Sequence, residues 1–241
     1  MTSLCGPELI VQIWLLWFLR ANAFFCYLRS MARAPSICAV ILAAGESTRM
    51  GRDKALLPWP PVGAGDPASG GTFLSAGIRS LSPFSDMVIV VAGKNEANLA
   101  PVVYAEGAFL VRNPEPERGQ FSSLQVGLQE VLNRGRDAAM VTLVDRPPVS
   151  PATLQQLHDA FESALVAEKW AVVPESGGRH GHPILLDREM MNAFMKAPPT
   201  ATAREIEHQH EDRIQYVTVD DPGIRTNVDT PQDYADLSSS G

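Results

Sequence analysis

Four charged side chains, spread over three distant parts of the sequence, have the chemistry needed to hold a polyphosphate and its metal ion. Arg49 and Lys54 follow a glycine turn, and arginine and lysine are the cations that proteins use on phosphate oxygens. Asp145 ends an apolar run and Asp229 precedes Thr-Pro. Magnesium takes only a few protein carboxylates, since phosphates and water complete its shell. The place of Asp145 at the end of a predicted strand therefore makes it a candidate Mg²⁺ ligand.

The turn after the first apolar run is the strongest single signal. It reads Leu42-Ala43-Ala44-Gly45 and continues through Arg49 to Lys54. Small residues let a backbone approach a ligand closely, and successive N–H groups can cradle phosphate oxygens. The string is neither a Walker A motif nor a Gly-x-Gly-x-x-Gly fingerprint. It predicts a phosphate-binding loop of another type; an ordinary glycine turn with solvated charges is the alternative.

Two further segments combine glycine with polar side chains. One runs from Asn113 through Gly119 to Ser122 and Ser123, where a predicted helix begins and free N–H groups attract anions. Simple capping of that helix by Ser122 is the other interpretation. The second segment is a Gly-rich turn, 177–183, whose two histidines lack a third soft ligand for a zinc site.

Strand-like and helix-like patterns alternate from Ser36 onward, which predicts an α/β fold with a mainly parallel sheet covered on both faces. Pro58–Gly71 is rich in Pro and Gly and is expected to be a loop. The predicted strands are 37–43, 87–92, 109–112, 138–144, 171–174, 183–186 and 213–219. The predicted helices are 73–81, 122–132, 151–166, 203–208 and 231–237.

Composition limits the class of protein and its partners. The 241 residues carry a formal net charge of -7 without a long basic run, which disfavours nucleic acid as a partner. Three scattered cysteines fit neither a zinc site nor a disulfide framework, and indicate a reducing compartment such as the cytoplasm. We expect one domain over residues 36–237 and a short tail, 238–241.

Residues 1–35 are an apolar N-terminal extension whose nature the sequence leaves open. Its core, Leu9–Leu28, is long enough for a membrane anchor, which would make the protein membrane-associated. A misassigned start codon upstream of Met31 is the alternative.

The string Leu42-Ala43-Ala44-Gly45, with Ser47, Arg49-Met50-Gly51 and Lys54, resembles the signature of nucleotidyltransferases in the molybdenum cofactor branch. The likeness extends over about Ser36 to Leu237, and Ala44 with Gly-His-Pro is closer to the cytidylyltransferase type than to the guanylyltransferase type. The resemblance implies a Rossmann-like nucleotidyltransferase fold with a mixed, mostly parallel sheet and helices on both faces. It also implies transfer of CMP from CTP to molybdopterin with release of pyrophosphate, and a molybdoenzyme that receives the cofactor.

The resemblance also assigns roles to residues. Arg49, Lys54 and Asp145 would be catalytic, and Asp145 and Asp229 would bind Mg²⁺. The residues expected to bind nucleotide are Leu42, Ala43, Ala44, Gly45, Arg49, Lys54, Asn113, Gly119, Ser122 and Ser123. Gly181, His182 and Pro183 match the family's Gly-His-Pro on the acceptor side, and Arg179 is added as a cation near an anionic acceptor. Arg146 departs from the family, which commonly has glutamine after the aspartate, and this puts fine specificity near the metal in doubt.

Two other functions remain open from the sequence. One is a related nucleotidyltransferase that uses another NTP and a sugar phosphate or other phosphorylated metabolite. The other is a non-catalytic nucleotide- or cofactor-binding protein with the same fold. Pyrophosphate release would separate an enzyme from a binder, and a panel of nucleotides and acceptors would separate the enzymes.

Overall fold

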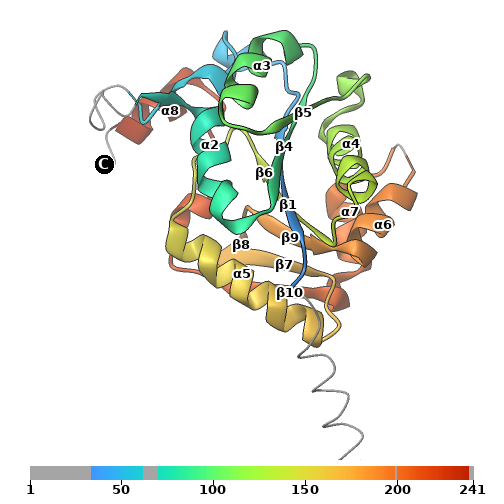
Figure 1. The fold of residues 1–241 in the computed structure, drawn as a ribbon. Helices are drawn as coiled ribbons and strands as arrows, with labels where there is room; N and C mark the ends of the chain where they lie inside the picture. Colours follow the sequence, from blue (N-terminus) through green and yellow to red (C-terminus); the bar gives the residue numbers. More distant parts are fainter. Residues whose placement is uncertain (1–33, 62–69, 199, 239–241) are drawn as a thin grey trace, which may run out of the picture. The chain divides into compact units, whose positions relative to one another are not determined.

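A sheet of mostly parallel strands forms the centre of the protein (Figure 1), and its strand order in the computed structural model is β10-β7-β9-β6-β1-β4-β5, with β8 paired to β7. The structure describes residues 34–61, 70–198 and 200–238. Strand β1 pairs in parallel with both β4 and β6, whereas β9 runs antiparallel to β6 and to β7. The predicted mixed, mostly parallel sheet is confirmed.

The sheet strands are β1 (Ile37–Ala43), β4 (Met87–Ala92), β5 (Phe109–Arg112), β6 (Ala138–Leu143), β7 (Ala171–Ser176), β8 (Arg179–His180), β9 (Ile184–Asp187) and β10 (Ile214–Thr218). The helices are α2 (Phe73–Leu81), α3 (Glu96–Ala105), α4 (Gln120–Asn133), α5 (Pro151–Val166), α6 (Arg188–Lys196), α7 (Ala203–Gln209) and α8 (Pro231–Ser238). Short 3-10 turns include η1 (Thr48–Met50), η2 (Lys54–Leu56) and η7 (Pro222–Arg225).

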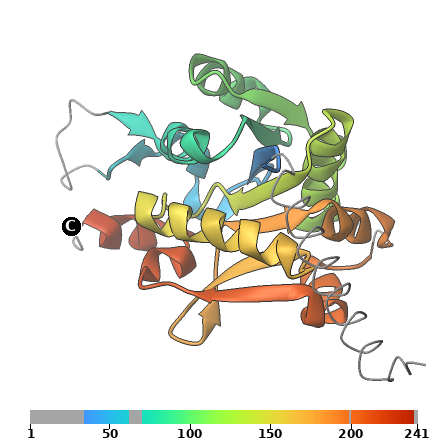
Figure 2. The same ribbon diagram turned by 60° about the horizontal axis from the view of Figure 1, so that its bottom comes forward.

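Alternate residues of the central strand β1 face two separate apolar layers. Ile37, Ala39 and Ile41 pack with α2, α3 and α5, while Cys38 and Val40 pack with α4, α6 and α7. Figure 1 shows these two groups of helices on opposite sides of the sheet, and in Figure 2 α5 lies along the sheet in front. A strand buried on both faces reads as a continuous apolar run, which is why β1 and β4 were predictable.

Two helices were not predicted from the sequence. Helix α3 contains Pro101 and has no clear apolar stripe, so local periodicity does not indicate it. Helix α6 begins at the cap Asp187, whose side chain accepts a hydrogen bond from the Met190 N–H, and buries Met191 and Phe194. The apolar spacing within α6 could have predicted this helix from the sequence.

Two predicted loops contain short strands. Pro58–Trp59 (β2) pairs with Gly71–Thr72 (β3), because the ends of the Pro/Gly-rich segment meet as a two-stranded ribbon. Residues 62–69 between them lie outside the described residues. Within the Gly-rich turn, β8 forms as a short hairpin on β7.

Contacts group Pro35–Gly241 into one compact unit. The predicted domain over residues 36–237 stays a prediction. No helix within the described ranges is long and apolar enough to cross a membrane. The anchor predicted for Leu9–Leu28 lies outside those ranges.

Candidate nucleotide and metal site

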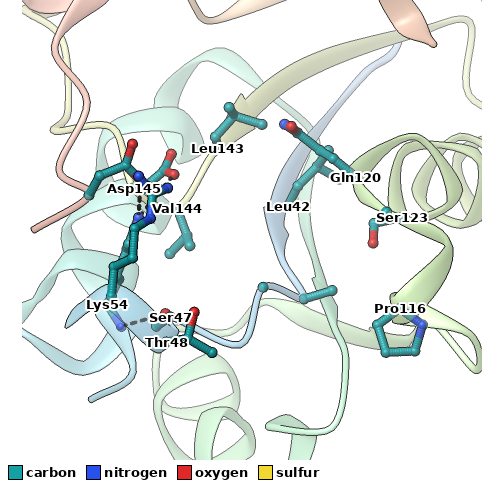
Figure 3. A pocket seen from close by; sticks show the side chains of 15 residues that line it. Leu42, Ser47, Thr48, Lys54, Pro116, Gln120, Ser123, Leu143, Val144 and Asp145 are labelled. Atoms are coloured by element: carbon teal, nitrogen blue, oxygen red, sulfur yellow. Dashed lines mark hydrogen bonds and ion pairs between the residues drawn. The ribbon is translucent and has the colours of Figure 1, made fainter. Parts of the chain in front are cut away.

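The turn after β1 opens onto a cleft of about 320 Å³ at the carboxyl ends of β1 and β6. In open α/β sheets this edge is where ligands bind. Figure 3 shows Lys54 and Asp145 on one side of the cleft and Pro116, Gln120 and Ser123 on the opposite side. The full lining is Leu42, Ala44, Gly45, Ser47, Thr48, Arg49, Lys54, Pro116, Gly119, Gln120, Ser123, Leu143, Val144, Asp145 and Asp229.

The loop is held in shape by its own polar groups. Ser47 has a left-handed backbone (φ 51°), its carbonyl accepts the Met50 N–H, and its Oγ accepts the Lys54 N–H at 3.2 Å. Asp53 and Asn95 hold the other side, because the Asn95 amide donates to Asp53 and to the Ala43 carbonyl. The backbone N–H groups of residues 45–49 donate to none of the described residues. The loop therefore offers free donors to an anion.

Two glycines beside the loop differ in what surrounds them. Apart from its chain neighbours, no atom of the described residues lies within 4 Å of where a Gly45 Cβ would stand, so that space is open to a ligand. A Cβ on Gly93, at the end of β4, would lie 2.7 Å from the Ala44 carbonyl oxygen. Gly93 thus lets the loop rest on the sheet, a role that the sequence interpretation missed.

Lys54 joins the two predicted metal ligands. Its Nζ lies 2.5 Å from Asp229 Oδ1 and 3.5 Å from Asp145 Oδ2, and its side chain is 10% exposed. Arg49 Nη2 also reaches Asp229 Oδ1, at 3.1 Å. The hydrogen bond from Lys54, together with both positive charges, lowers the pKa of Asp229. Lys54 therefore contacts the carboxylates, whereas the sequence predicted it on phosphate.

A backbone hydrogen bond explains why aspartates so distant in the sequence meet. The Val228 N–H donates to the Asp145 carbonyl at 2.9 Å, and the Val228 side chain is buried with Met50, Leu57 and Phe73. Asp229 then follows directly. Asp233 accepts the N–H groups of Asp229 and Thr230 and so starts α8 at this point.

The carboxylate pair fits a divalent cation. Asp145 Oδ1 is buried and accepts no hydrogen bond from any described residue, and an unsatisfied buried carboxylate oxygen is costly unless a cation completes it. Within the described residues no group of three or more His, Cys, Asp or Glu side chains gathers to hold a metal, at the cleft or elsewhere, so the pair would need further ligands. Two carboxylates suffice for Mg²⁺ when a polyphosphate supplies the other ligands.

Three residues expected to bind nucleotide line no part of the cleft. Asn113 is 2% exposed and its amide donates to the hydroxyls of Ser122 and Ser123. Ser122 in turn donates to the Gly119 carbonyl, so both side chains serve to shape the start of α4. The Ala43 side chain packs in the apolar layer that contains α2, α3 and α5. Gly119, whose φ of +95° favours glycine, and Ser123 do line the cleft.

A second cavity, of about 930 Å³, adjoins the cleft and shares four lining residues with it: Leu42, Gly119, Gln120 and Leu143. His182 lines this cavity, and its backbone N–H donates to the Ile224 carbonyl. Gly181 is packed so closely on Ile224 that any side chain would overlap it. Pro183 follows a cis peptide bond beneath the cavity. Arg179 is exposed on β8 and lines neither cavity, because the β7–β8 hairpin carries it away.

His182 should make protein stability depend on pH. Burial, with the Arg146 charge adding to it, lowers the pKa of His182 to about 3. The folded protein keeps this histidine neutral, whereas in the unfolded chain it takes up a proton near pH 6.5. Protonation therefore stabilises the unfolded state relative to the folded state. The free energy of unfolding should therefore fall as pH drops below 6.5, by up to about 1.4 kcal/mol per pH unit.

Denaturant unfolding at pH 7 and pH 5 checks this expectation. His182→Gln should flatten the difference between the two pH values, whereas His208→Gln, at an exposed histidine, should leave it unchanged. Each variant is compared with the wild type, because Asp187 adds a pH dependence of stability with the opposite sign. Burial raises the pKa of Asp187 to about 6. An equal pH dependence in His182→Gln and wild type would contradict a buried neutral imidazole.

Together, the sheet order, the open loop and the paired carboxylates define a nucleotide-binding α/β protein of the nucleotidyltransferase class. The MobA-like NTP transferase domain family matches residues 39–214, and the chain belongs to this family. It is a nucleotidyltransferase of that family, as the resemblance in the first strand and its loop predicted.

Individual relatives agree with the family. A probable molybdenum cofactor guanylyltransferase of Rhodopirellula baltica is 33% identical over 55% of this chain, and the match spans 59% of that relative. The molybdenum cofactor cytidylyltransferase of Escherichia coli is 24% identical over 83% of this chain and 94% of its own length. The solved structure of Rv0371c from Mycobacterium tuberculosis has a TM-score of 0.71 at 27% identity, covering 87% of this chain and 100% of that one. The same protein has also been solved in complex with manganese, with a TM-score of 0.67 at 24% identity over 86% of this chain and 100% of that one.

Proposed function

We propose that this protein transfers CMP from CTP to the phosphate of a molybdopterin-type acceptor, with release of pyrophosphate, in the cytoplasm. The observation that carries the proposal is the cleft itself. Its lining includes loop residues with open N–H groups and the Asp145 and Asp229 carboxylates, which share the Lys54 ammonium group. The larger cavity beside it has room for the acceptor. The relatives named for the molybdenum cofactor support the acceptor class.

The reaction needs little covalent help from the protein. An oxygen of the acceptor phosphate attacks the α-phosphorus of the nucleotide, the bond to the bridging α–β oxygen breaks, and pyrophosphate leaves with those electrons. A phosphate monoester is already a nucleophile at neutral pH, so catalysis consists of positioning and charge neutralisation. Asp145 and Asp229 would hold Mg²⁺, which supplies positive charge to the phosphates. Arg49 and the loop N–H groups would bind the pyrophosphate portion, joined by Lys54 once the carboxylates hold a metal.

CTP is proposed as the nucleotide because Ala44 and the Gly-His-Pro segment, 181–183, resemble the cytidylyl type. GTP is the competing choice, since the Rhodopirellula relative is named as a guanylyltransferase. Pyrophosphate release should be measured with CTP, GTP, UTP and ATP, with molybdopterin or a sugar phosphate as acceptor. We expect kcat/KM for CTP with molybdopterin to exceed the other pairs by at least about tenfold. A preference for GTP would replace the nucleotide, and no turnover with any pair would overturn the enzyme proposal.

The space in front of Gly45 gives a test of loop binding that leaves the protein fold alone. Gly45→Ala should leave the melting temperature nearly unchanged, because the new methyl group has open space in front of it among the described residues. It should raise the KM for the nucleotide by about tenfold or more, since phosphate oxygens need that space. Gly93→Ala is the matched comparison, because its methyl group meets the Ala44 carbonyl and should lower stability as well. An unchanged nucleotide KM in Gly45→Ala would argue against phosphate at this turn.

A further inference from the structure

The larger cavity is basic although the whole protein is acidic. Its charged lining consists of Arg118, Arg146, Arg204 and Glu207, which is three guanidinium groups and one carboxylate. The protein as a whole has a formal net charge of -7. A local excess of cations in a hollow concentrates anions there whatever the global sign. The chemistry of the lining therefore selects an anionic occupant.

Arg146 differs from the other two arginines in its attachment and position. One terminal nitrogen donates to the Ile224 carbonyl at 3.0 Å, and this carbonyl also accepts the backbone N–H of His182. Arg146 directly follows Asp145, and the charges of Asp145 and Asp229 act on its guanidinium. The side chain thus lies at the border between the metal site and the larger cavity, held by one hydrogen bond.

Two nitrogen atoms at this border have no hydrogen-bond partner in the part of the chain that the structure describes. Arg146 Nε and His182 Nδ1 are both buried, and neither forms a hydrogen bond with any described residue. A buried polar atom left unpaired costs about 1–3 kcal/mol, so proteins rarely keep two together without a use for them. Both belong to side chains that line the same cavity and that meet the same Ile224 carbonyl. Neither side chain therefore has its full hydrogen-bonding capacity used by the described residues.

We infer that Arg146, with His182 beside it, binds the phosphate group of the acceptor and directs its oxygen toward the α-phosphorus held next to Asp145 and Asp229. The inference rests on the proposed function in taking the occupant to be a phosphate monoester. A guanidinium tied down through one nitrogen keeps its remaining N–H groups for a two-pronged contact with phosphate. An amide at this position would offer the N–H groups of a single nitrogen and no charge. Arg146 is therefore a determinant of acceptor specificity in this chain, favouring a dianionic phosphate.

The experiment compares Arg146→Gln, Arg146→Lys and Arg49→Ala, with Arg112→Gln at an exposed arginine as control. Inorganic phosphate is titrated into each protein without nucleotide and followed by ³¹P NMR. Arg146→Gln should weaken saturable phosphate binding by about tenfold or more, and Arg146→Lys by less. The control should retain all phosphate binding, and Arg49→Ala should retain the binding event that Arg146→Gln weakens while weakening any second phosphate held by the loop. Binding lost in Arg49→Ala but kept in Arg146→Gln, or no saturable binding in wild type, would overturn the inference.

Kinetics provide the second readout. With CTP and molybdopterin, Arg146→Gln should raise the KM for the acceptor at least tenfold while the KM for CTP stays within about twofold. A purely structural role through Ile224 would instead lower the melting temperature and raise both KM values, and would contradict the inference. If Arg146→Gln does not fold, Arg146→Lys supplies the same comparison. If no nucleotide gives turnover, the proposed function fails, and the phosphate titration still decides the role of Arg146.

Discussion

Asp145→Asn is expected to reduce turnover by about three orders of magnitude, equivalent to about 4 kcal/mol of activation free energy. The substitution removes the charge of a carboxylate whose Oδ1 has no partner among the described residues and which shares Lys54 with Asp229. The fold should survive, because the contact that holds the C-terminal segment uses the Asp145 backbone carbonyl, which asparagine retains. Steady-state pyrophosphate release measures the loss, and manganese binding followed by electron paramagnetic resonance measures the metal site.

Asp159→Asn is the matched control for this substitution. Asp159 is exposed on α5, where its carboxylate accepts a hydrogen bond from Gln155, and the same chemical change there should alter neither activity nor metal binding. The melting temperature of both variants should stay within a few degrees of the wild type. If Asp145→Asn kept wild-type turnover and manganese affinity, Asp145 would not belong to the metal site.

Lys54→Met should give the second large effect, which combines a loss of stability with a gain in metal affinity. The methionine fills nearly the same space but leaves Asp145 and Asp229 without their shared ammonium. With the three side chains 10%, 24% and 26% exposed, the loss in a chelating buffer should be about 2 kcal/mol. Added Mn²⁺ should restore most of it, since the metal no longer competes with a lysine. The kcat/KM for the nucleotide should fall at least about a hundredfold.

Lys169→Met controls for loss of a lysine elsewhere. Lys169 lies just before β7, at the end of that strand opposite to the cleft. Its ammonium group donates to the Asp212 carbonyl. Thermal unfolding with and without Mn²⁺ compares the two variants. If Mn²⁺ stabilised neither protein, the carboxylates would not form a cation site, and an equal gain in Lys54→Met and wild type would show that Lys54 does not compete with the metal. An unchanged kcat/KM would remove Lys54 from phosphate binding.

Local pattern was sufficient for most elements of the fold. Apolar runs such as Met87–Ala92 can be buried only with both faces covered, and caps such as Ser150 before Pro151 mark a helix start without reference to the rest of the chain. Helix α3 was not predicted, because Pro101 lies inside it and its stability comes from packing of Leu99 and Val103 on the sheet. The antiparallel direction of β9 could not be predicted either, since a strand's periodicity does not carry its direction.

For the site, the amino-acid sequence by itself determined which chemistry was present: a glycine loop, two cations and two aspartates of the kinds that hold a polyphosphate and a metal. It could not determine which of these groups touch, because a hydrogen bond such as that from Val228 to Asp145 joins positions 83 residues apart in numbering. Only the tertiary structure decided that Lys54 lies between the carboxylates, that Asn113 is buried, and that Arg146 and His182 share the Ile224 carbonyl. The physical reason is that residue type is a local property, whereas burial and pairing depend on which distant segments the sheet brings together.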